Sequence, residues 1–170
     1  MDAAIAADFQ TLAQIAITLV GFTGIIGVIQ ARGGNALAGP EAGLIATLLV
    51  VSALAVFASF IPGTVALVIG NEADMWKWSF RVLIVAHIGA WIVATPFMLR
   101  AGLLLGKLPE PERSITRLFA LIGMTTVVAE GFVVFGQAAP YSAFIYQFIL
   151  ITLVAIGFVS FVLLMFGLNR

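Results

Sequence analysis

Five long runs of apolar residues, each bracketed by charged or polar residues, constrain the fold of this chain more than any other feature. A helix needs about 20 apolar residues to cross the hydrocarbon core of a bilayer. The runs predict transmembrane helices over residues 9–31, 42–70, 79–101, 115–137 and 141–168. They lack period-2 alternation and are too long for strands, which excludes a β-barrel. The predicted fold is all-α: a polytopic integral membrane protein with a bundle of five transmembrane helices in one domain, residues 1–170.

The overall composition agrees with lipid as the main solvent of the side chains. Hydrophobic residues make up 62% of the chain and charged residues 9%, against about 45–50% and about 25% in an ordinary globular protein. The longest segment between runs, Ala101 to Thr116, is too short to fold alone. The start, MDAAIAADF, has no Lys or Arg and is unlike a secretory signal peptide, so we expect the first helix to be retained.

Lysine and arginine near the helix ends predict the orientation, because these residues stay on the cytoplasmic side. The other side would hold only Lys77 and Arg81. We therefore expect the N-terminus outside and the C-terminus inside, in the bacterial cytoplasmic (inner) membrane. Outer-side aromatic residues, which favour the headgroup level, would be Trp76, Trp78, Tyr141 and Tyr146. The cytoplasmic side would collect Arg32, Arg100, Lys107, Arg113, Arg117 and Arg170.

Two ionisable residues, His87 and Glu130, fall inside predicted helices. Such residues cost several kcal/mol in hydrocarbon, so each is a candidate functional residue. At about 1.5 Å per residue, both lie about 5 Å to the outer side of the midplane, which makes a direct contact possible. The same arithmetic puts Thr18 and Ser59 near that level. A structural role remains open, since one satisfied pair can simply hold two helices together.

His87 is also one helical turn from Trp91. This His-x-x-x-Trp arrangement, five residues in one helix, resembles that of the influenza proton channel. The resemblance implies that the imidazole takes up protons and that the indole gates their exit. The alternative is that Trp91 fills a gap between helices, as interior aromatic residues commonly do.

A polar stripe is predicted on the fourth helix, where Gly123, Thr126, Glu130 and Gln137 share one face. Such a stripe should face protein or water and not lipid. The candidate ion or proton path is therefore lined by Glu130, His87, Trp91, Thr126, Thr18 and Ser59.

Small residues predict close helix packing at two places. One is a strip of Gly21, Gly24 and Gly27, and the other is the GxxxG of Gly102 and Gly106. Whether the neighbouring helix belongs to the same chain stays open, with packing inside the chain favoured for each. Pro62 and Pro96 fall inside or near the ends of predicted helices, which they should bend.

Several function classes have no support in the sequence. There is no cysteine, and the single histidine cannot by itself supply both ligands of a bis-histidine haem, so we expect no metal or cofactor site. Zero net charge without a basic block argues against nucleic acid as a partner. No H-E-x-x-H or G-x-S-x-G motif appears, and we expect no enzyme activity.

Two functional hypotheses remain. The first is a homo-oligomeric proton or ion channel, or transport protein, whose path passes Glu130 and His87. Short-looped protomers of this size would most easily form a pore around a symmetry axis. The second is a non-transporting accessory or scaffold subunit of a larger membrane complex, held by its glycine strips.

Overall fold

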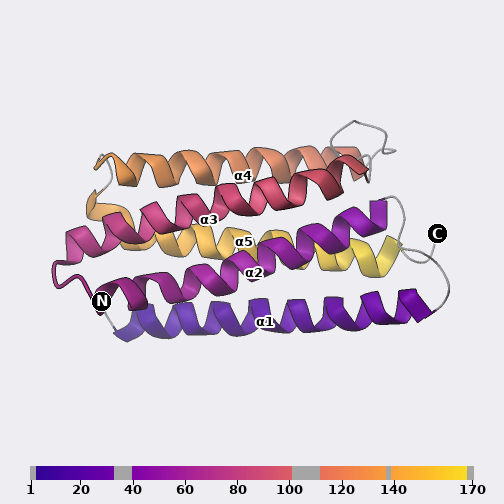
Figure 1. The fold of residues 1–170 in the computed structure, drawn as a ribbon, viewed down its shortest axis with the longest axis horizontal. Coiled ribbons are helices and arrows are strands. Elements are labelled where there is room, and N and C mark those ends of the chain that lie inside the picture. The colour runs from indigo at the N-terminus through magenta and orange to yellow at the C-terminus, as the bar shows by residue number, and fades with distance from the viewer. Residues whose placement is uncertain (1–2, 33–39, 101–111, 137–138, 168–170) are drawn as a thin grey trace.

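The structure, a computed structural model, describes residues 3–32, 40–100, 112–136 and 139–167 and is entirely helical over them, apart from the turns. The α-helices of this part are α1 (Ala3–Arg32), α2 (Pro40–Ala66), α3 (Glu72–Arg100), α4 (Glu112–Val134) and α5 (Ser142–Gly167). A short 3-10 helix, η1 (Ala139–Tyr141), precedes α5 (Figure 1). All five α-helices are long and apolar enough to cross a membrane. The prediction of an all-helical chain with five such helices is confirmed.

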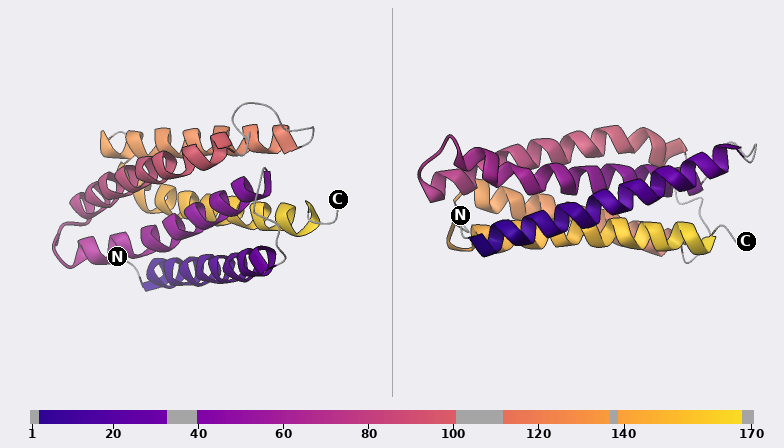
Figure 2. Two further views of the ribbon diagram at one scale, coloured as in Figure 1. Left: turned by 45° about the vertical axis from the view of Figure 1, so that its right-hand side comes forward. Right: turned by 90° about the horizontal axis from the view of Figure 1, so that it is seen from below.

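The bundle is formed by a row of neighbouring helices with one further helix behind it. Along the row, α1 contacts α2, α2 contacts α3 and α3 contacts α4, while α5 contacts all four. Successive helices run in opposite directions, so α1 begins and α5 ends at opposite ends of the bundle (Figures 1 and 2). We name the end that carries the connection between α2 and α3 the α2–α3 end. The contacts of α4 with α5 are fewer than those with α3.

Two helix boundaries at the α2–α3 end differ from the prediction. Helix α2 ends at Ala66 and not at residue 70, because the chain turns there: the Val68 N–H donates to the Val65 carbonyl at 3.0 Å. Helix α3 begins at Glu72 and not at residue 79. The Asn71 side chain accepts a hydrogen bond from the Ala73 N–H at 2.9 Å, which caps the helix start.

An aromatic cluster fills the core near the α2–α3 end. Its ring centroids lie 5.1 to 6.5 Å apart, and it consists of Phe9, Trp76, Phe80 and Tyr146. All four side chains are buried. Trp76 and Tyr146 are therefore core residues of the bundle, and their depth near a membrane surface stays a prediction. Trp78 and Tyr141 are exposed on the bundle surface.

A proline inside α2 explains how α5 is attached. Pro62 has no N–H, so the carbonyl of Ala58, four residues earlier, loses its helical donor. The Tyr146 hydroxyl donates to this carbonyl at 2.7 Å, and both Pro62 and Tyr146 are fully buried. The proline in α2 thus leaves an acceptor that α5 satisfies.

The glycines divide into those that permit close packing and those that face outward. A Cβ on Gly157 of α5 would lie 3.0 Å from the Ser52 Oγ, so this glycine lets α5 approach α2 closely. Gly21 and Gly24, by contrast, are exposed with nothing within 4 Å of an added Cβ. The favoured prediction of packing inside the chain is wrong for these two. Gly27 lies further along α1, and Gly102 and Gly106 lie outside the described residues.

Candidate functional site

The two ionisable residues singled out from the sequence are in direct contact. The His87 Nδ1 lies 2.8 Å from the Glu130 Oε1, across the interface of α3 and α4. Their side chains are 3% and 0% exposed. The contact that equal depth made possible is present, and it is the only ionic contact between side chains within the described residues.

The protonation of this pair follows from its burial, because an uncompensated charge in hydrocarbon is costly. Three arrangements leave the pair neutral overall. An imidazolium Nδ1–H can donate to the carboxylate, a protonated Glu130 Oε1–H can donate to the imidazole Nδ1, or the Nδ1–H of a neutral imidazole can donate to the Oε1 of a Glu130 that is protonated on Oε2. In each of them one proton lies between the two residues. The His87 Nε2 carries a hydrogen in the first two arrangements and a lone pair in the third, so its role depends on the tautomer.

Glu130 keeps one oxygen free. Its Oε2 is buried without a hydrogen-bond partner among the described residues. The nearby Thr126, also buried, does not serve it, because its hydroxyl donates to the Gly123 carbonyl of the same helix at 2.8 Å. A buried acceptor without a donor costs about 1–3 kcal/mol. Leaving Oε2 without a donor therefore lowers the free energy of unfolding.

Trp91 packs against α4 one turn along from the pair. A Cβ added to Gly123 would lie 2.9 Å from the Trp91 Cζ2, so only glycine leaves room for the indole there. Because α3 and α4 run in opposite directions, His87 contacts Glu130 and Trp91 contacts Gly123. This contact matches the alternative in which Trp91 fills a gap between helices.

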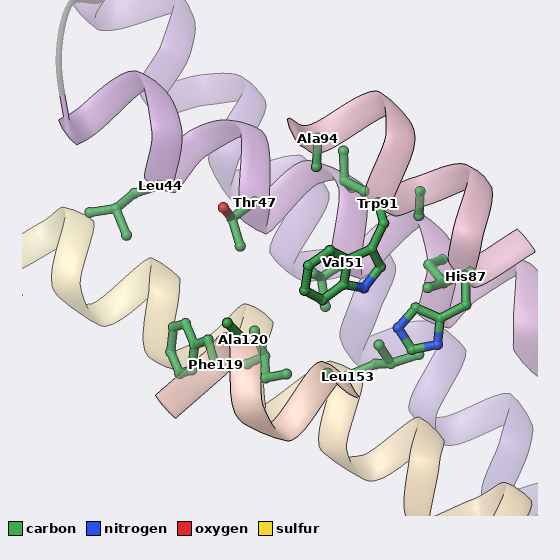
Figure 3. A pocket seen from close by; sticks show the side chains of 14 residues that line it. Leu44, Thr47, Val51, His87, Trp91, Ala94, Phe119, Ala120 and Leu153 are labelled. Atoms are coloured by element: carbon green, nitrogen blue, oxygen red, sulfur yellow. The ribbon is translucent and has the colours of Figure 1, made fainter. Parts of the chain in front are cut away.

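A cavity of about 90 Å³ begins at His87 and extends away from the α2–α3 end (Figure 3). Helices α2, α3, α4 and α5 all contribute to its wall. The lining residues are Leu44, Thr47, Val50, Val51, Leu54, His87, Ala90, Trp91, Ala94, Phe119, Ala120, Gly123, Leu153 and Ile156. Nearly all of this surface is hydrocarbon.

Two ring nitrogens in the cavity wall make no hydrogen bond. The His87 Nε2 and the Trp91 Nε1 have no hydrogen-bond partner among the described residues. Figure 3 shows the indole nitrogen on the side of the ring that faces His87. Thr47 is different, because its hydroxyl donates to the Gly43 carbonyl at 2.8 Å.

The remaining predicted path residues are not gathered at the pair. Thr18 is exposed on α1, with its hydroxyl donating to the Gln14 carbonyl at 2.9 Å. Ser59 bonds to the Ala55 carbonyl at 2.8 Å and lines a groove between α1 and α2. Gln137 lies outside the described residues. The path residues that share one place in the structure are Glu130, His87, Trp91 and Thr126.

Some features of the site could not be found in the sequence. The cavity depends on how far α4 stands from α2, and no residue pattern encodes that distance. The use of Tyr146 as a donor to Ala58 had one signal, a proline inside an apolar run, which frees a carbonyl at a known position. Among the described residues, no cluster of three acidic, histidine or cysteine side chains could hold a metal ion.

The site as a whole offers three chemical features. They are a proton shared between two buried groups, a free carboxyl oxygen and an adjoining apolar cavity. The role of the pair is inferred from these features alone, because family models, curated protein sequences and solved structures give no match to this chain.

Proposed function

We propose that this protein is a homo-oligomeric membrane protein that moves protons, or another small cation, across the bilayer. The buried contact between His87 and Glu130, with Oε2 left free, carries the proposal. A pair kept only to hold two helices would be expected to satisfy both oxygens. The proposed setting is the bacterial cytoplasmic membrane, with the α2–α3 end outside.

The pair has the parts of a proton relay. Its shared proton can move between Oε1 and Nδ1, because the two atoms lie 2.8 Å apart and either one can carry it. The free Oε2 can accept a second proton, and the Nε2 hydrogen can leave toward the cavity. Protons would therefore enter and leave on different atoms of the same pair.

Apolar side chains adjoin the pair on both sides. The aromatic cluster fills the core toward the α2–α3 end, and the apolar cavity lies on the other side. Hydrophobic constrictions of this kind gate by excluding water. We infer a closed state, in which conduction requires α4 to move relative to α2 and α5.

The homo-oligomer is supported by one face of α1. This α1 face is exposed on the bundle surface and consists of Gln10, Gln14, Thr18, Gly21 and Gly24. The Gln10 and Gln14 side chains have no hydrogen-bond partner among the described residues. Amide and glycine residues are the types by which membrane helices associate, so a second copy facing its own α1 face would satisfy them.

The decisive test is proton flux into liposomes that contain the purified protein. Replacing Glu130 by Gln keeps the shape but removes the oxygen that can bind and release a proton, and we expect the flux to fall about 100-fold or more, in the range typical of a lost acid–base group. The control is Glu72→Gln, an exposed carboxylate at the start of α3, which should change the flux less than about 2-fold. Absence of proton, sodium or potassium flux in the unaltered protein across pH and voltage would contradict the proposal.

The second candidate, an accessory or scaffold subunit of a larger membrane complex, is favoured by the same α1 face, which could dock a different helix. It requires a partner that co-purifies in fixed stoichiometry. A homogeneous homo-oligomer in lipid nanodiscs would exclude it.

A further inference from the structure

One exposed stripe of α1 has a composition unlike that of a lipid-facing surface. It follows the helix in alternating steps of four and three residues, and this α1 stripe consists of Gln10, Gln14, Ile17, Gly21, Gly24 and Val28. The exposed stripe of α4 has the same spacing but is mainly large and apolar: Leu118, Leu121, Thr125, Val128, Phe132 and Phe135. Large apolar side chains suit lipid, whereas amides and glycines suit a neighbouring helix.

The amides of the α1 stripe lie at a depth where lipid cannot serve them. At about 1.5 Å per residue from the midpoint of the predicted helix 9–31, Gln10 lies about 15 Å and Gln14 about 9 Å from the midplane. The hydrocarbon core extends about 15 Å to each side. Neither amide has a hydrogen-bond partner among the described residues, whereas Gln147 donates to the Asp8 Oδ2 at 2.8 Å. Gln14 in particular therefore needs a partner from outside the protomer.

A second copy of the chain meets this need. Two copies in one membrane have the same orientation, so a two-fold axis between them is normal to the membrane and brings identical residues to equal depth. A glutamine amide has both donors and acceptors, so Gln14 can bond to the same amide of the partner. Steps of four and three residues are the spacing of left-handed helix pairs, and the two glycines let the backbones approach closely.

The groove between α1 and α2 leaves room for the partner at the same level. Its volume is about 450 Å³. The wall includes Gln10, Gln14 and Ile17 from α1 and Ser59, Phe60 and Gly63 from α2. A Cβ added to Gly63 would meet nothing within 4 Å, so packing inside the protomer does not fill this space. Side chains of a second α1 can therefore enter the groove beside the amides.

This interface determines where the buried pairs of the two copies lie. Helix α1 packs against α2 and α5 at one edge of the row, whereas the pair of His87 and Glu130 lies between α3 and α4 at the other edge (Figure 1). In a dimer joined through α1, both pairs lie on the outer sides, away from the axis. Helix α4 then faces lipid in each copy and is free to move without disturbing the interface.

We propose that the protein is a dimer joined along the α1 stripe, with its two-fold axis normal to the membrane, and that each protomer has its own proton path through His87 and Glu130. The dimer requires only insertion into a membrane, whereas the separate paths rest on the proposed function. A two-fold contact uses the stripe of each copy once and closes at two copies. The arrangement places no path on the symmetry axis.

Cross-linking of the cysteine-free chain in liposomes at low protein density tests the interface. Ile17→Cys should form a disulfide-linked dimer on oxidation with copper phenanthroline, because identical residues near a two-fold axis meet. The control, Val128→Cys on α4, matches it in exposure, 56% against 54% for Ile17, and should stay unlinked. The depths also match, at about 3 and about 4.5 Å from the midplane. Linking at Val128 and not at Ile17, or an unaltered assembly of more than two copies in nanodiscs, would overturn the dimer.

Mixed dimers test the separate paths. Ile17→Cys protomers with two different affinity tags are linked, and dimers with one Glu130→Gln copy are purified by both tags. Formation of the link shows that the altered copy is folded. We expect about half the proton flux of the linked dimer whose two copies both keep Glu130, because distant sites act independently. A flux far below half would show a shared path and overturn the proposal of two paths.

The outcomes separate this inference from the proposed function. Absence of flux from the linked dimer with Glu130 in both copies would contradict proton transport, and the two paths with it. The link at Ile17 and the mass of the assembly would still decide the dimer, since neither measurement depends on transport.

Discussion

At the residue scale, the contact between the Tyr146 hydroxyl and the Ala58 carbonyl shows how a carbonyl without a helical donor gains a donor from another helix. Pro62 removes a donor from α2, and the freed carbonyl lies in the core, where water cannot satisfy it. A hydroxyl from α5 takes the place of the missing N–H. The proline and the tyrosine therefore depend on each other, although they are distant in the sequence.

This dependence predicts a specific double-mutant result. Tyr146→Phe should lower the free energy of unfolding by about 1 kcal/mol, because the Ala58 carbonyl is left unsatisfied. In a Pro62→Ala background the backbone N–H restored by the substitution would bond to the Ala58 carbonyl, so the same change should cost close to nothing. Reversible unfolding in mixed micelles, followed by circular dichroism, measures all four proteins. Equal costs in the two backgrounds would show that the hydroxyl does not replace the helical donor.

At the element scale, α4 is held mainly by α3, and the buried pair lies in that interface. Removing one partner leaves the other buried and unpaired, which is strongly destabilising, whereas replacing both by hydrocarbon of similar volume often is not. Stability and the proposed proton transfer would thus make opposite demands on the pair.

Leucine replacements separate these demands. His87→Leu and Glu130→Leu should each lower the unfolding free energy by about 3 kcal/mol, and the double variant should lose less than either single one. The double variant should nevertheless fail to conduct protons in liposomes. Strictly additive losses of stability, measured by the same unfolding assay, would show that the two residues do not act as a pair.

The elements also show how far the sequence could lead. Helix number was predictable from run length, and the equal depth that follows from the rise per residue made a contact of His87 with Glu130 possible. The rotation of each helix about its own axis could not be predicted. Thr18 and Ser59 have the right depth but face elsewhere, since helices that are apolar on every side carry little information about which side is buried. The cavity depends on that rotation and on helix spacing, so it was missed.

At the scale of the whole molecule, the α1 face is the surface by which we propose that the protein assembles. Its amides and glycines lie on the bundle surface. Many of the residues exposed elsewhere carry large apolar side chains. Burying this face against a second copy would satisfy the amides and let two α1 backbones approach closely.

Gly21→Leu should therefore shift the protein toward the monomer in nanodiscs, because a bulky side chain separates the two α1 helices. Ala53→Leu, a similar addition on the exposed surface of α2, is the control and should leave the oligomer intact. The mass of the assembly, determined by light scattering, is the measurement. An assembly unaffected by Gly21→Leu would place the interface on another helix.

The proposed orientation is open to a direct test, because the chain has no cysteine. Asp74→Cys, in the first turn of α3, should react in intact cells with a maleimide that cannot cross the membrane. Lys107→Cys should react only after the cells are permeabilised, since basic segments stay cytoplasmic. The reverse pattern of labelling would invert the proposed topology.

The position of α5 behind the row of the other helices has a consequence for how the protein is made. The ribosome completes α1 to α4 before α5, so the parts of α2 at Ala58 and Ser52 gain their contacts with α5 last. Under the proposed insertion into a membrane, we expect the first four helices to form a loosely associated intermediate in which the carbonyl freed by Pro62 still lacks its donor. Arrival of α5 should then complete the core in a single step, so biogenesis should depend on how long the first four helices survive unfinished.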